Sequence, residues 1–447
     1  MSLEALIERC ETATLHVPLG TVLDVVGLIV EIGGLKAAVG ETLAIKASAS
    51  HSLDVEVVGF RGGRLLATPL GPLTGVRPGA RVARQNRGPT VAVSDALLGR
   101  VVDAFGRPMD GGPPINARKS RSVQGSPPSP FERRPIETRL ATGVRVLDGL
   151  LPLGLGQRMG IFAGAGVGKS TLLGMICRSS TADVNVVGLI GERGRELNDF
   201  VRNALGPEGL SRSVVVTATS DQPPLVRARG AESATAIAEH FRDQGKSVLL
   251  VMDSVTRYAM ALREAALAAG EPPATKGYPP SVFAALPRLL ERAGTAGGEG
   301  VITALYTVFV EGDDLGDPVA DAVRGVLDGH IVLSRELADS GHFPAVDVLK
   351  SVSRLAQDIA SQADLASAAA LRSLLAAYHD AKDLIQLGAY VAGSDPRVEL
   401  AKAALPEIHA FLQQRLDDRA ALPETLARLH ALARKVTAIP QAAPPRR

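Results

Sequence analysis

The spacing of hydrophobic positions changes twice along this chain, and the first change comes near residue 88. Before it, apolar and polar residues alternate in short runs that glycine and proline pairs such as Gly33-Gly34 and Pro78-Gly79 separate. The clearest runs are 21–32, 42–47, 54–58 and 64–68. Alternation with a period of two is typical of half-buried strands, and many short strands with regular turns predict a small β-barrel.

From about residue 140, continuous apolar runs alternate with segments of helical spacing. The expected strands are 159–163, 185–190, 213–218, 247–252, 300–307 and 330–333. The expected helices between them include 225–244, 256–269 and 281–293. This alternation predicts a parallel sheet with right-handed crossovers and helices on both faces.

Two further segments complete this pattern. Residues 124–135 are rich in proline and predict an extended connection on the surface. After about residue 355 the chain is rich in alanine and leucine at helical spacing, which predicts a C-terminal helical domain.

Residues 163–170 lie between an expected strand and an expected helix at 170–177. They match the phosphate-binding P-loop, G-x-x-x-x-G-K-[ST], at every fixed position but the first, where Ala163 replaces glycine. Backbone N–H groups and the helix N-terminus of such a loop close around a phosphate chain. Lys169 is then expected to reach the β- and γ-phosphates, and the Ser170 hydroxyl to ligate Mg²⁺. The expected nucleotide contacts are Gly164, Ala165, Gly166, Val167, Gly168, Lys169, Ser170 and Thr171.

Two carboxylates follow expected strands of the same sheet. Asp253 ends the run 247–252, where a carboxylate can hold Mg²⁺ through a water; it can also cap the helix that begins near Thr256. Glu192 follows the run 185–190, where it can polarise an attacking water or form an ion pair with a nearby arginine. Ligands of parallel sheets gather at this edge, so both carboxylates are candidates for a nucleotide site.

Charge and cysteine content narrow the class of protein. The formal net charge is only +2, so no global electrostatic attraction to nucleic acid or membrane is expected. Between Arg77 and Arg145, however, 13 Lys/Arg stand against 5 Asp/Glu, which indicates a solvated basic surface or a binding patch. Two cysteines, Cys10 and Cys177, form no disulfide framework. Without a secretory signal or a long apolar run, the sequence predicts a cytoplasmic protein.

Together these residues resemble the flagellar protein export ATPases, the type III secretion relatives of the catalytic subunits of rotary ATP synthases. The resemblance covers nearly the whole chain. It also rests on residues 99–112, 143–152, 156–163, 191–196, 311–314 and 327–335. Residues 387–396 resemble the flagellar branch rather than the injectisome branch.

The resemblance implies an α/β fold with three parts. Residues 1–88 would form the N-terminal β-barrel, 89–356 a RecA-like P-loop domain around the parallel sheet, and 357–447 the C-terminal helical domain. It also implies that Glu192 activates water, that Arg193 approaches the γ-phosphate, and that Arg354 is an arginine finger. Taken alone, Arg354 would be assigned to the surface.

A P-loop, a candidate catalytic carboxylate and a candidate finger share one chain. A head-to-tail homo-oligomeric ring would therefore complete every site without a second protein, and the resemblance implies six subunits. The implied activity is Mg²⁺-dependent ATP hydrolysis that energises flagellar protein export. The implied location is the cytoplasmic face of the inner membrane.

The resemblance further implies several partners. These are a stator-like export regulator that binds the N-terminal segment around residues 3–11, a coiled-coil stalk protein, export chaperones and the membrane export gate. A nonflagellar type III secretion ATPase would share the same chemistry. A ring similar to transcription termination factor Rho would need aromatic platforms for RNA, but only Phe60 and Phe105 precede Phe131. No nucleic-acid partner is expected, and Glu192 argues against a non-hydrolysing rotary subunit.

The sequence specifies the contacts of the nucleotide's adenine base less clearly than those of its phosphates. The resemblance leads us to expect an aromatic adenine platform shortly after Arg354. No aromatic residue lies between Arg354 and Tyr378, and Leu365 stands near the expected place. The sequence therefore specifies the phosphate contacts and leaves the adenine contact open.

Overall fold

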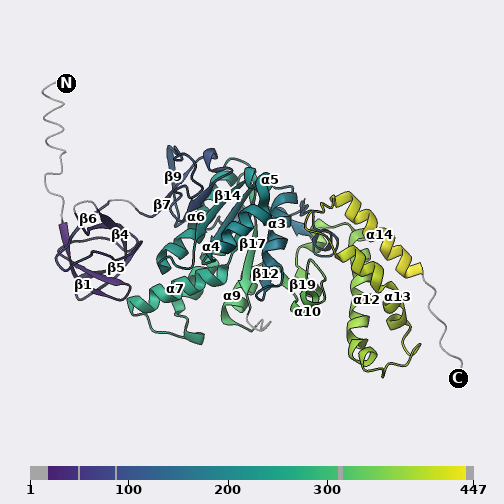
Figure 1. Cartoon of the computed structure of the whole chain (residues 1–447). Coiled ribbons are helices and arrows are strands. Elements are labelled where there is room, and N and C mark those ends of the chain that lie inside the picture. Colours follow the sequence, from purple (N-terminus) through teal and green to yellow (C-terminus); the bar gives the residue numbers. More distant parts are fainter. Residues whose placement is uncertain (1–18, 49–50, 86–87, 311–315, 439–447) are drawn as a thin grey trace. The chain divides into compact units, whose positions relative to one another are not determined.

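The computed structural model describes residues 19–48, 51–85, 88–310 and 316–438. It divides into two compact units (Figure 1). The first contains residues 1–90, 222–226 and 261–279, and the second contains 91–221, 227–260 and 280–447. The expected docking segment at 3–11, Cys10 and the motif at 311–314 lie outside the described residues.

The first unit contains a closed barrel of six antiparallel strands in the order β1-β2-β5-β4-β3-β6. The strands are β1 (Leu19–Val26), β2 (Ile29–Gly33), β3 (Thr42–Lys46), β4 (Ser52–Arg61), β5 (Arg64–Pro69) and β6 (Arg81–Arg84). Apolar side chains such as Val30, Leu43 and Val55 fill its interior. The predicted barrel is confirmed, but the run 21–32 is a hairpin rather than one strand. Gly27, with φ of +58°, turns the chain there.

The second unit is built on a nine-stranded sheet, and its strand order explains where ligands gather. The order is β19 (Val346–Ser353), β18 (Gly329–Leu333), β12 (Arg158–Ala163), β17 (Val301–Phe309), β15 (Ser247–Asp253), β13 (Val184–Ile190), β14 (Ser213–Ala218) and β8 (Val101–Asp103), with β16 (Gly294–Thr295) beside β17. The strands from β18 to β8 are parallel, whereas β19 and β16 are antiparallel to their neighbours. The predicted parallel core is confirmed, with antiparallel additions that the apolar pattern did not reveal.

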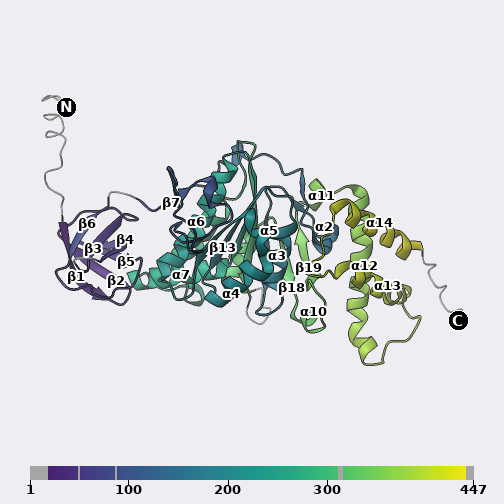
Figure 2. The ribbon, with the colours of Figure 1, turned by 45° about the horizontal axis from the view of Figure 1, so that its top comes forward.

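Helices flank this sheet (Figures 1 and 2). The α-helices described up to residue 359 are α2 (Arg145–Leu150), α3 (Lys169–Ser179), α4 (Gly194–Asp199), α5 (Gly206–Ser211), α6 (Pro224–Arg242), α7 (Val255–Ala269), α8 (Pro280–Leu290), α9 (Pro318–Val326), α10 (Arg335–Asp339) and α11 (Ala356–Ile359). Strand β13 is buried along its whole length, as a strand covered on both faces must be. Two small ribbons join β7 (Thr90–Val93) to β9 (Lys119–Ser122) and β10 (Arg139–Leu140) to β11 (Leu153–Gly154).

The C-terminal part of the second unit is helical, as predicted. It contains α12 (Gln362–Gln386), α13 (Pro396–Leu412) and α14 (Leu422–Ala438), of which α12 packs against both others. Ser361 and Asp364 form a capping box at the start of α12, and Asp395 caps α13. Apolar side chains of these helices belong to the same core cluster as one face of the sheet. Within the described residues, no helix is long and apolar enough to span a membrane.

Several described arginines of the basic stretch between Arg77 and Arg145 form ion pairs within their own unit. Five of its arginines pair with carboxylates: Arg84 with Glu41, Arg100 with Asp110, Arg121 with Glu239, Arg133 with Glu291, and Arg139 with Asp364. The prolines at 124–135 form the expected irregular connection, with one 3₁₀ turn at Pro130–Glu132. The pairing favours a structural role for this stretch over a binding patch.

Candidate functional site

The P-loop joins the end of β12 to the start of α3, as its sequence predicts. Gly166 and Gly168 have φ of +77° and +86°, which only glycine adopts without strain. Ala163, which replaces the first glycine of the motif, is the last residue of β12 and is extended, so its methyl group is tolerated. Gly168 directly precedes α3, and the positive end of the helix dipole therefore faces the loop.

A cavity of about 750 Å³ opens over this loop. The P-loop lines it together with residues that follow β13, β14 and β15 and with the last residue of β17, at the same edge of the sheet. The lining residues are Gly164, Ala165, Gly166, Gly168, Lys169, Ser170, Thr171, Gly191, Glu192, Arg193, Glu196, Ser220, Ser254, Arg257 and Phe309. Of the predicted nucleotide contacts, only the Val167 side chain turns away, because it is buried in the core. Backbone N–H groups, a helix N-terminus and cations together suit a phosphate chain.

Lys169 lies between the two predicted carboxylates. Its Nζ forms an ion pair with Oδ1 of Asp253 and lies 3.8 Å from Oε1 of Glu192. The Asp253 side chain is only 4% exposed, and Thr307 Oγ1 donates a hydrogen bond of 2.6 Å to its Oδ1. These contacts fix Asp253 at the end of β15, beside the phosphate loop.

Burial and neighbouring charges set the protonation of this group. Burial raises the pKa of Glu192 to about 7, the Asp253 carboxylate adds to the rise, and the Lys169 ammonium opposes it. Burial also disfavours the charged form of Lys169, but Asp253 and Glu192 outweigh it and raise the pKa of that ammonium. Glu192 is therefore poised to gain or lose a proton near neutral pH, which suits a general base.

The structure places the two predicted arginines differently. Arg193 occupies the N-cap position of α4 and lines the cavity. Its side chain is 82% exposed and its Nε lies 4.0 Å from Oε1 of Glu196, so the guanidinium can turn toward a ligand at little cost. Arg354 follows β19, is exposed, and is not among the described residues that line the cavity. Within the described parts of the chain, its side chain forms no ion pair. This placement is compatible with a role in another subunit's site.

The donor set fits Mg²⁺ bound together with phosphate. Ser170 offers a hydroxyl at the start of α3, and Asp253 offers a carboxylate at the end of β15. Among the described residues no cluster of three or more His, Cys, Asp or Glu forms a complete metal cage. Mg²⁺ in phosphate sites characteristically takes one or two protein oxygens and completes its shell with phosphate and water.

A second cavity, of about 310 Å³, adjoins the P-loop. Gly168 and Thr171 line both cavities. The rest of the second lining is mostly apolar: Leu172, Met175, Phe343, Pro344, Gln414, Arg415 and Leu416. A Cβ atom built at Gly168 would lie 3.3 Å from the Phe343 ring, so the ring packs directly on the loop. An aromatic side chain that precedes Arg354 in the sequence thus lies beside the phosphate loop.

The segment between α13 and α14 completes this second cavity. The Gln414 backbone N–H donates to the Phe343 carbonyl at 2.9 Å, which holds the aromatic residue at the loop. Leu365, near which the platform was expected, lies in α12 and is not among the described residues that line the cavity. Arg257 also lines the first cavity and was not predicted from the sequence. It lies in the first turn of α7, the helix that follows Asp253, and this position could have indicated a place near the phosphate site.

The comparisons with known proteins agree with this geometry. Residues 143–353 match the nucleotide-binding domain of the ATP synthase alpha/beta family, and residues 360–431 match the T3SS EscN ATPase C-terminal domain. The chain is 52% identical to the flagellum-specific ATP synthase of Pseudomonas aeruginosa, with 92% of both chains covered. It is 49% identical to the type 3 secretion system ATPase of Xanthomonas euvesicatoria, with 95% of this chain and 96% of the relative covered.

Solved structures of type III secretion ATPases are also similar to this chain. The assembled ATPase EscN from the enteropathogenic E. coli type III secretion system aligns with a TM-score of 0.87 at 44% identity, over 93% of this chain and all of that one. The α/β fold with its barrel, central sheet and helical C-terminal part is thus confirmed. The chain belongs to the ATP synthase alpha/beta family, in the group of flagellum-specific ATP synthases and type III secretion ATPases, and is an ATP hydrolase.

Proposed function

We propose that this chain is the subunit of a homo-oligomeric ring whose Mg²⁺-dependent ATP hydrolysis energises flagellar type III protein export. The observation that carries the proposal is the meeting of Lys169, Glu192 and Asp253 at the mouth of one phosphate-binding loop. Fixed cations, a helix N-terminus and a carboxylate titrating near neutrality are the parts that phosphoryl transfer to water requires.

Each group has a distinct task in this proposal. Lys169 leaves Asp253 and pairs with the β- and γ-phosphates. Ser170 and Asp253 would hold Mg²⁺, which would neutralise phosphate charge. Glu192, released from its nearest cation, accepts a proton from the attacking water. Arg193 turns toward the γ-phosphate from the start of α4.

The base occupies the second cavity. The Phe343 ring stacks on the adenine, and Leu172, Met175 and Leu416 exclude water from its other surfaces. The P-loop residues Gly168 and Thr171 border both cavities, so one extended nucleotide can fill them together.

Arg354 completes the site of the adjacent subunit. Its exposure and its place outside the cavity of its own chain support a finger that acts across a subunit interface. EscN is described as assembled and in complex with its central stalk EscO, and we propose a ring, of six subunits, with a stalk partner for this chain as well. The further proposed partners are a stator-like regulator, export chaperones and the membrane export gate, at the cytoplasmic face of the inner membrane.

The decisive experiment mixes two inactive variants, Glu192→Gln and Arg354→Ala, under conditions where rings form. In a random 1:1 mixture about a quarter of the interfaces join an intact Glu192 to an intact Arg354. ATP turnover should therefore recover to about a quarter of the wild-type rate. Equal mixtures that stay inactive would show that Arg354 does not act across the interface.

The flagellar assignment rests on residues 387–396 and on the flagellum-specific relatives. The injectisome alternative is kept because the Xanthomonas relative is almost as similar. Deleting the gene should abolish flagellar assembly and motility while other protein secretion continues. Motile deletion cells would assign the chain to a nonflagellar export system.

A further inference from the structure

We propose that Gln157 is a positioning residue for Arg354. The inference rests on the proposed function, in which Arg354 is a finger, and adds what holds that finger in place. Gln157 precedes β12, far from Arg354 in sequence, yet its buried amide contacts the two groups that adjoin the Arg354 backbone.

All the hydrogen-bonding groups of the Gln157 amide are engaged by the protein. The residue is 0% exposed. Its Nε2 donates to the Asp328 carbonyl at 3.0 Å and to the Ser353 hydroxyl at 3.2 Å. Its Oε1 accepts from the Gly154 N–H at 2.8 Å. Because both donors and the acceptor are satisfied, the amide has a single orientation.

The same carbonyl holds the backbone of the finger. The Arg354 N–H donates to Asp328 O at 3.0 Å, so this oxygen accepts from Arg354 and from Gln157 at once. Ser353, the residue before the finger, accepts from Gln157 and donates to the Pro152 carbonyl at 2.7 Å. The base of the finger is thus restrained by backbone and hydroxyl contacts, while its side chain remains exposed.

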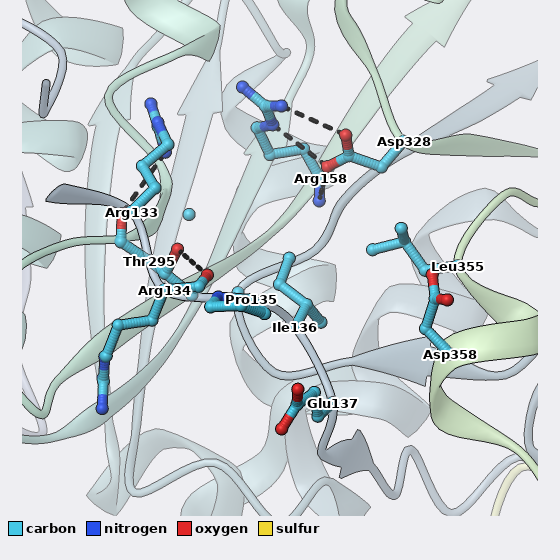
Figure 3. A pocket seen from close by; sticks show the side chains of 12 residues that line it. Arg133, Arg134, Pro135, Ile136, Glu137, Arg158, Thr295, Asp328, Leu355 and Asp358 are labelled. Atoms are coloured by element: carbon cyan, nitrogen blue, oxygen red, sulfur yellow. Dashed lines mark hydrogen bonds and ion pairs between the residues drawn. The ribbon is translucent and has the colours of Figure 1, made fainter. Parts of the chain in front are cut away.

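Asp328, whose carbonyl accepts from Arg354 and Gln157, is itself held in place by several hydrogen bonds. Arg158 donates to the Asp328 carboxylate from its backbone N–H at 3.0 Å and from Nε and Nη2 at 3.1 Å each (Figure 3). Next along the chain, Gly329 pairs with Ser353 between β18 and β19. A Cβ atom there would lie 2.5 Å from the Val352 carbonyl, so only glycine permits this close approach. These contacts therefore hold Asp328, and with it the backbone of Arg354, against strands β12 and β18.

A finger works only where its guanidinium meets charge that develops in the transition state. A misplacement of about 1 Å can cost about 100-fold in rate, because this interaction depends on geometry. The binding of ATP to the adjacent subunit's P-loop does not depend on the contact with the Arg354 guanidinium. Loss of the Gln157 amide should therefore lower kcat and leave the KM for ATP nearly unchanged.

Three variants and a matched control test this split. Gln157→Met removes the amide at similar volume, Ser353→Ala removes its hydroxyl partner, and Ser353→Thr restores a hydroxyl. Asn185→Leu is the control, because Asn185 is also 0% exposed and its amide donates to the Cys177 carbonyl at 2.9 Å and the Ser213 hydroxyl at 3.1 Å.

We expect Gln157→Met and Ser353→Ala to lower kcat about 10- to 100-fold, with the KM for ATP unchanged. Ser353→Thr and Asn185→Leu should keep the wild-type kcat per folded ring. A kcat for Gln157→Met equal to that of Asn185→Leu would overturn the proposal. Should Gln157→Met fail to fold, Ser353→Ala and Ser353→Thr give the same test, because equal kcat values for that pair would overturn it too.

Mixed rings separate a failure of this proposal from a failure of the proposed function. Gln157→Met should regain turnover when mixed with Glu192→Gln. Mixed with Arg354→Ala it should not rise above its own lowered rate, because both variants are defective in the finger. The reference mixture is Glu192→Gln with Arg354→Ala. If only the reference recovers, Gln157 does not position the finger. If the reference also stays inactive, the finger itself is wrong.

Discussion

Replacing Glu192 by glutamine should make the nucleotide-free protein more stable at pH 8. The side chain of Glu192 is only 17% exposed. Burial, together with the adjacent Asp253 carboxylate, raises the pKa of its carboxyl from 4.5 to about 7. The folded state therefore binds this proton more tightly than the unfolded state. The contribution of this protonation to the free energy of unfolding is complete below pH 4.5 and is lost as the pH rises through 7.

The difference between 4.5 and about 7 corresponds to about 3 kcal/mol of unfolding free energy at pH 8. Glutamine imitates the protonated acid, so Glu192→Gln should gain about this amount at pH 8 and nothing near pH 4.5. The measurement is urea unfolding followed by far-UV circular dichroism, because the chain has no Trp for intrinsic fluorescence. Glu132→Gln is the control, because the side chain of Glu132 is exposed and does not line this cavity.

Catalysis should respond to pH in the opposite direction. As the pH falls through 7, Glu192 gains a proton and can no longer accept one from water, so kcat/KM should fall about tenfold per pH unit. The fold gains stability from the same protonation, which excludes unfolding of this site as the cause. If kcat/KM were constant from pH 8 to pH 6, or if Glu192→Gln were no more stable than wild type at pH 8, the role assigned to Glu192 would be refuted.

Three other perturbations have clear expected outcomes. Lys169→Ala should abolish ATP turnover. It should also destabilise the nucleotide-free protein by about 3–5 kcal/mol, because Asp253 stays buried without its cation. Adding Asp253→Asn to this variant should recover much of the lost stability, as measured by urea unfolding. Phe343→Ala should raise the KM for ATP about tenfold, whereas Phe343→Tyr should not, since stacking needs only the ring. EDTA should stop turnover and added Mg²⁺ restore it, and Asp253→Asn should need more Mg²⁺ in the same titration; turnover that persists in EDTA would contradict the metal site.

The sheet could be predicted where strands are long and continuously apolar. Runs such as 247–252 and 185–190 are buried on both faces, and this burial is what the sequence records. Strand β8 has only three residues, and its pairing with β14 is a tertiary contact that its own composition does not encode. Strand β19 lies at the edge of the sheet and exposes Lys350, so its pattern lacks the apolar continuity of the central strands.

The candidate site could be predicted only in part, for a similar reason. The P-loop and the carboxylates at 192 and 253 are local signals, because each follows directly from the strand before it. Phe343 reaches the loop because the chain turns back between β18 and β19, which no spacing in the sequence reveals. The hydrogen bond between Gln157 and Ser353, the residue before Arg354, joins positions 196 residues apart in the sequence, and only the folded chain brings them together.

The shared core of sheet and C-terminal helices has a practical consequence for anyone who shortens this chain. The Phe411 ring of α13 packs on Gly149 of α2, where an added Cβ would lie 2.9 Å away, and the Gln414 side chain bonds the Arg145 N–H and the Gly143 carbonyl. A truncation after residue 356 would therefore expose apolar surface and leave buried polar groups unpaired. We expect such a fragment to aggregate on expression and to be degraded by proteases, so residue 357 is a poor place to cut.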